Sequence, residues 1–79
     1  MNTRLENIKK ILDDKGVLHI ITSKGYYLLD ITKPTFHLDS IAIPNITSQN
    51  PTDAEFDEDG NIWISTNKKG LFFIEKNIS

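Results

Sequence analysis

An all-β fold is the class that this sequence predicts, and three observations support it. The apolar segments are short and rich in β-branched and aromatic residues, as in VLHIIT and NIWIST, which is typical of strands. Acidic residues precede a glycine in DDKG and DEDG, and this composition favours tight turns. The succession of strand and turn also occurs twice along the chain, which indicates a repeated β-unit.

The repeat becomes visible when Gly16 is aligned with Gly60, 44 positions later. In the runs LHIIT and IWIST, Leu18 then meets Ile62, His19 meets Trp63, Ile20 meets Ile64 and Thr22 meets Thr66. One inserted residue, Lys69, keeps the next pair of glycines aligned, and YYLL then coincides with LFFI. Matching glycines between matching apolar runs indicate a true internal repeat.

Each copy is expected to form three strands joined by two turns. In the first copy the strands are predicted at Asn7–Leu12, Val17–Thr22 and Tyr26–Asp30. In the second copy they are predicted at Asp53–Phe56, Asn61–Thr66 and Leu71–Glu75. The first of these segments, within RLENIKKIL, also fits one face of a helix. Its counterpart in the second copy, PTDAEFDEDG, favours the strand.

A fourth strand is predicted at Thr35–Ser40, and the second copy has no counterpart to it. Four antiparallel strands in about 40–45 residues is the period of a β-propeller blade. Both faces of YYLL and LFFI are apolar, as expected of a sheet covered on both sides. We therefore expect a single unit over residues 1–79, with a four-stranded blade at 7–40, a linker at 41–52 and an incomplete blade at 53–79.

The segment FDEDGNIWISTNKKGLFFIE resembles the two-component regulator propeller repeat, whose pattern runs roughly D-x-x-G-N-L-W-I-G-T-x-x-G-G-L. In the second copy the matching positions are Asp57, Gly60, Asn61, Ile62, Trp63, Ile64, Thr66, Gly70 and Leu71. Ser65 and Lys69 replace glycines of the pattern. In the first copy, where His19 stands at the tryptophan position, the matching positions are Asp13, Gly16, Leu18, Ile20, Thr22 and Gly25.

The resemblance implies a segment of the extracytoplasmic sensor region of a bacterial hybrid histidine kinase. It implies a periplasmic location, neighbouring propeller blades as partners, and the sensing of ligands that are often derived from sugars. A carbohydrate is therefore a candidate ligand. No catalytic, cofactor-binding or metal-binding residue is assigned to this chain.

Two blades leave apolar outer faces uncovered, because a propeller closes with about four to eight blades. Further blades, or assembly of several copies, would cover these faces, and rearrangement into a small sandwich is the third solution. The alternative function is accordingly a self-assembling propeller, built from identical short chains, that binds a glycan. An enzyme with a propeller fold is disfavoured, because the acidic residues fall in turns.

Composition excludes several function classes. The net charge is −2 with interspersed lysines and acids, so no basic surface for nucleic acid is expected. The absence of cysteine removes disulfides and thiolate metal sites. The N-terminal segment has no apolar run of the kind found in signal peptides, and no stretch approaches the roughly 20 apolar residues of a membrane span.

Three groups of side chains were weighed as sites. The acidic run contains Glu55, Asp57 and Asp59 at alternate positions before a glycine, together with Asp53 and Glu58, as in a calcium loop. Thr66 stands where that loop needs its glutamate, so a solvated hairpin turn is the favoured interpretation. The other two groups are a metal site from His19, His37 and Asp39, and sugar stacking by Trp63, Tyr26 and Tyr27. His19 and Trp63 occupy repeat positions, which favours structural roles for both.

Overall fold

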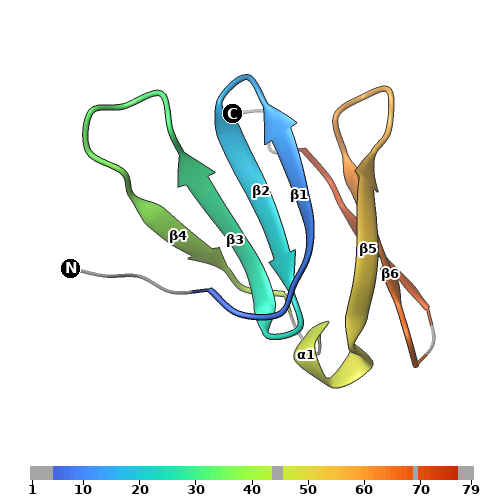
Figure 1. The fold of residues 1–79 in the computed structure, drawn as a ribbon. Helices are drawn as coiled ribbons and strands as arrows, with labels where there is room; N and C mark the ends of the chain where they lie inside the picture. Colours follow the sequence, from blue (N-terminus) through green and yellow to red (C-terminus); the bar gives the residue numbers. More distant parts are fainter. Residues whose placement is uncertain (1–4, 44–45, 69, 77–79) are drawn as a thin grey trace.

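The computed structural model describes residues 5–43, 46–68 and 70–76, and these form two antiparallel β-sheets (Figure 1). The first sheet has four strands in chain order: β1 (Ile8–Asp14), β2 (Val17–Thr22), β3 (Gly25–Asp30) and β4 (Leu38–Ile41). The second has three: β5 (Pro51–Phe56), β6 (Ile62–Thr66) and β7 (Leu71–Ile74). The predicted all-β class is confirmed, with a one-turn helix, α1 (Ile46–Gln49), between the sheets.

The predicted strands are all present, although some ends differ. The segment before the first turn is a strand and not a helix. The fourth strand begins at Leu38 and not at Thr35, because β4 pairs with β3 only from Leu38 to Ile41. Residues 31–37 form an exposed loop instead. The segment 41–52, expected as a linker, holds the last residue of β4, α1 and the first residues of β5.

The first hairpin turn explains why glycine is required at position 16. Lys15 and Gly16 both have positive φ, 53° and 90°, as a two-residue type I′ turn demands. A Cβ atom on Gly16 would also lie 2.3 Å from Cγ2 of Thr32. Asp13 Oδ1 accepts a hydrogen bond from the Gly16 N–H at 2.9 Å, so the acid and the glycine stabilise the same turn.

The two sheets share one pairing register. Equivalent residues lie 43 positions apart in the first strands, 44 in the second and 45 in the third, so His19 opposite Leu28 corresponds to Trp63 opposite Phe73. A bulge follows the first paired residue of both β1 and β5. The offset changes because each connection in the second copy is one residue longer between equivalent paired residues: five residues separate Phe56 from Ile62, against four between Asp13 and Leu18. The connection from Ser65 to Leu71 is likewise one residue longer than that from Ile21 to Tyr26.

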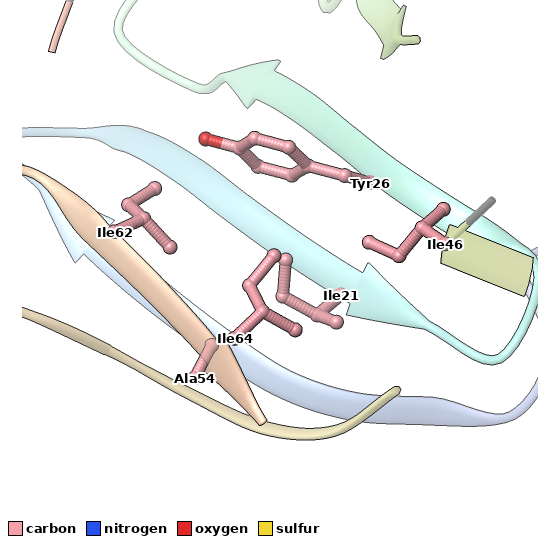
Figure 2. Packing of buried hydrophobic residues seen from close by; sticks show 6 residues of the cluster. All are labelled: Ile21, Tyr26, Ile46, Ala54, Ile62 and Ile64. Carbon is pink, nitrogen blue, oxygen red and sulfur yellow. The ribbon is translucent and has the colours of Figure 1, made fainter. Parts of the chain in front are cut away.

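The core lies between the two sheets and is completed by the short helix. Ile21 of β2 and Ile64 of β6 are fully buried and point toward each other (Figure 2). Ile46 of α1, which is 4% exposed, closes one end of this layer. The sheets approach most closely where β1 lies beside β5, and they diverge toward β4 (Figure 1).

The sheets stack front to back. We call the surface of the three-stranded sheet that meets the core its front face; it carries Ala54, Phe56, Ile62, Ile64, Phe72 and Ile74. We call the surface of the four-stranded sheet that meets the core its rear face; it carries Leu12, His19, Ile21, Tyr26 and Leu28. The residues of the four-stranded sheet that are equivalent to this front face lie on its outer side, away from the core. They are Ile11, Asp13, Leu18, Ile20, Tyr27 and Leu29. Corresponding faces therefore point the same way in the two sheets.

Replacing Ile64 tests the position of the core. We expect Ile64→Val to lower the free energy of unfolding by about 0.5–1.5 kcal/mol and Ile64→Ala by about 2–5 kcal/mol, because each leaves a cavity at a fully buried position. The same changes at Ile31, which is 44% exposed, should cost less than about 1 kcal/mol. Urea denaturation at one fixed protein concentration measures both series. Equal losses at the two positions would contradict this packing.

Candidate functional site

A cavity of about 440 Å³ lies between the sheets, on the side where they diverge. Its apolar wall is formed by Leu28 and Ile41 of the four-stranded sheet and by Ile62 and Ile74 of the other. The volume falls within the roughly 300–1,000 Å³ of small-molecule sites. The cavity is therefore the candidate ligand-binding site of the described chain.

Two aromatic side chains give this cavity its interior polar groups. Tyr26 Oη lies 2.5 Å from His19 Nδ1, and their rings are stacked with centroids 5.9 Å apart. The His19 ring also meets Phe56 of the opposite sheet edge-on, at 5.1 Å between centroids. His19 is thus held from both sheets at the wall of the cavity.

Burial determines the protonation of this pair. Desolvation lowers the pKa of His19 below its ordinary value, and the nearby Asp14 carboxylate only partly opposes this. Burial also raises the pKa of Tyr26 to about 12. Both groups are therefore neutral at pH 7, and one hydrogen bond joins the Tyr26 hydroxyl to His19 Nδ1, with the donor set by the imidazole tautomer. The raised pKa keeps the Tyr26 hydroxyl protonated, so it serves as a hydrogen-bonding group in the cavity lining.

Three charged side chains complete the cavity lining: Asp14, Glu75 and Lys76. All three are exposed, so they meet solvent where the cavity opens. Lys76 is positioned through its backbone, since its N–H donates to Asn61 Oδ1 at 2.8 Å. The site thus combines an apolar wall with carboxylates, an ammonium group and a neutral imidazole, which suits a small ligand that has both an apolar face and hydroxyl groups.

The Asp57 carboxylate organises the loop beside this site. Its Oδ1 accepts the N–H groups of Asp59 and Asn61, both at 2.9 Å, while Oδ2 accepts Asn61 Nδ2 at 3.1 Å and the Trp63 indole N–H at 3.0 Å. The hydrogen bond from Trp63 is the main reason that the pKa of Asp57 lies below its ordinary value, and those from Asn61 and Asp59 act in the same direction. Gly60, in the same loop, adopts a φ of 84° and contributes to the cavity wall.

The geometry of this loop explains the acidic run. Both Asp57 oxygens are directed at N–H donors of the loop itself, as in a tight turn. Asp53 lies apart from the loop, at the start of β5, where it is 3.7 Å from Lys10 Nζ. In residues 5–43, 46–68 and 70–76, no three histidine or acidic side chains converge in a metal-binding arrangement.

The structure separates the two histidines. His37 Nε2 lies 2.9 Å from Asp39 Oδ1 in an exposed pair at the start of β4. His19 lies on β2 and is separated from the Asp39 position by Leu28 of the intervening strand. Adjacent strands are about 4.8 Å apart, so the two positions are roughly 10 Å apart. The structure brings together only two of the three residues weighed as a metal site.

The three aromatic residues weighed for sugar stacking also lie apart. Tyr26 is buried in the rear face of the four-stranded sheet, and Tyr27 occupies its front face. Trp63 is 39% exposed on the outer side of the three-stranded sheet, where its ring contacts Phe73 at 4.6 Å between centroids. Of the three, only Tyr26 lines the cavity.

Sequence reasoning did not identify the cavity, although it considered two of its residues. Leu28, Ile41 and Lys76 carry no chemical signature, and the topology alone brings them together. The available signal was His19, a polar residue where the repeat places an aromatic one. Comparison with known protein families, curated proteins and solved structures gave no match, so the functional argument rests on these residues. No helix in the described ranges could span a bilayer, since α1 has only four residues.

The buried histidine predicts a pH effect on stability. Because the pKa of His19 is lowered on folding, the unfolded chain takes up its proton first as the pH falls through about 6.5. Its contribution is therefore complete above that pH and is lost below it. Between pH 7.5 and 5.5 we expect the wild type to lose more free energy of unfolding than His19→Phe. The difference should stay below about 1 kcal/mol, because solvent reaches part of the ring.

Urea titrations at the two pH values measure this difference, and His37→Phe is the matched control. His37 is exposed, so its removal should leave most of the pH dependence unchanged. The assignment to His19 would be wrong if His37→Phe, and not His19→Phe, removed the loss at low pH.

Proposed function

We propose that this chain is a non-catalytic, ligand-sensing segment of a β-propeller, with one four-stranded blade and one incomplete three-stranded blade. The observation that carries the proposal is the front-to-back stacking of two sheets that share one register. In a propeller every blade presents the same face to the next, so successive blades stack in this way. In a two-fold symmetric sandwich, corresponding faces would meet each other instead.

The angle between the sheets supports the same proposal. The first strands, β1 and β5, lie together, and the later strands spread apart (Figure 1). Blades arranged around a central channel converge at their inner strands and diverge outward. The cavity occupies the diverging part of this wedge.

A sugar-sized ligand in this cavity is the form of sensing that the residues support best. The Lys76 ammonium group is a donor, the Asp14 and Glu75 carboxylates are acceptors, and the neutral His19 imidazole adds a further hydrogen-bonding group. Leu28 and the other apolar lining residues offer a surface for the C–H face of a sugar ring. With the resemblance to two-component regulator repeats, this favours a sensor role outside the cytoplasm, with neighbouring blades as partners.

Calorimetric titration with monosaccharides and disaccharides tests the proposed function. We expect a sugar to bind and to be recovered chemically unchanged. Lys76→Ala should weaken binding by about tenfold, because it removes one charged hydrogen-bond donor. Lys68→Ala removes an equally exposed lysine that does not line the cavity, and should bind like the wild type.

Three results would contradict the proposed function. They are the failure of every sugar to bind, equal effects of the two lysine substitutions, and conversion of the bound sugar into product. The last would indicate an enzyme.

A further inference from the structure

The outer side of the three-stranded sheet carries an exposed apolar cluster. By register it is the rear face of that sheet, and it carries Trp63, Leu71 and Phe73 together with the polar residues Asp53, Glu55 and Ser65. These side chains are 39%, 57% and 48% exposed. Side chains of this size clustered on one face are characteristic of an interaction surface.

The outer side of the four-stranded sheet is a second apolar surface. It is the front face of that sheet, and its positions correspond one by one to those of the front face already packed in the core. The pairs are closely matched in size: Leu18 with Ile62, Ile20 with Ile64, Tyr27 with Phe72, and Leu29 with Ile74. Ile11, at the position of Ala54, is 49% exposed, whereas Ile20, at the position of Ile64, is 4% exposed.

We infer that the rear face of the three-stranded sheet binds the front face of the four-stranded sheet in a second copy of this chain. The core of each chain already joins a rear face to a front face. In the core, the rear face of the four-stranded sheet meets the front face of the three-stranded sheet. The two free faces are the rear face of the three-stranded sheet and the front face of the four-stranded sheet, so a contact between two copies would again join a rear face to a front face. This inference depends on the front-to-back stacking on which the proposed function also rests, and it adds the partner.

The rear faces of the two sheets also carry large side chains at equivalent positions, and these positions would form the contact between copies. Trp63 stands at the position of His19, Leu71 at that of Tyr26, and Phe73 at that of Leu28. An interface between unlike faces is heterologous, so its repetition closes a ring or extends a filament. Closure at about four to eight blades corresponds to about two to four chains.

Three positions make the free pair of faces more polar than the packed pair. Ser65 replaces Ile21 and Glu55 replaces Leu12 on the rear face, and Asp13 replaces Phe56 on the front face. The intermolecular contact is therefore weaker than the internal one, and its strength can be changed at these positions. Ser65→Ile restores the residue type of the internal interface and should tighten association about tenfold.

Light scattering during size exclusion, from micromolar to millimolar chain, tests the inference. We expect the wild type to form a multimer of the 9.0 kDa chain as the concentration rises. Leu71→Glu should weaken association at least tenfold, because it places an unpaired charge in the interface. Phe36→Glu makes the same kind of change at a 65% exposed side chain in the loop before β4, outside the strands that form the two faces, and should associate like the wild type.

Mixing two blocked variants distinguishes the proposed interface from a symmetric one. Leu71→Glu blocks a rear face, and Ile11→Glu blocks a front face, so each alone should be monomeric. Their equimolar mixture should form a dimer, because one free front face meets one free rear face. Dimerisation of Ile11→Glu alone, or a wild type that stays monomeric at millimolar concentration, would overturn the inference. Sugar binding by such a monomer would leave the proposed function intact, whereas a multimer that binds no sugar would overturn only the function.

Discussion

The contact between the rear face of one sheet and the front face of the next determines the rest of this structure. Ile21 and Ile64 meet at its centre, and both are completely buried. The cluster of buried apolar side chains lies in this contact, so both sheets depend on it for hydrophobic stabilisation. The short helix strengthens it by adding Ile46 to the same layer.

The cavity and the exposed faces follow from this contact. Because the sheets are close at β1 and β5 and diverge beyond them, the contact leaves space beside His19 and Tyr26. Because each sheet uses a different face, the chain ends in one free front face and one free rear face. The cavity and the two free faces are therefore two consequences of the same stacking.

The strands could be predicted from the sequence because turn chemistry and β-propensity are local properties. DDKG and DEDG specify their turns directly, and Gly16 and Gly60 adopt the positive φ that this requires. The last three residues of the loop before β4, 35–37, were wrongly predicted as strand because pairing with β3, which limits that strand to Leu38–Ile41, is not a local property. The cavity was missed for the same reason, since Leu28 and Ile74 come together only when the sheets pack. Asp57 was recognised as a turn residue, but its bond to the Trp63 indole depends on the direction of the side chain across the strand.

Methyl and aromatic nuclear Overhauser effects in solution test the front-to-back stacking most directly. The structure predicts cross-peaks between the methyl groups of Ile64 and Ile21, and between the rings of His19 and Phe56, whose centroids are 5.1 Å apart. Ile20, the neighbour of Ile21 on the opposite face, should show none to Ile64 within one chain. Dilute samples, with one labelled chain in an unlabelled excess, keep contacts between copies out of the spectrum. Cross-peaks from Ile64 to Ile20 in place of Ile21 would mean that corresponding faces meet each other, and would contradict the stacking.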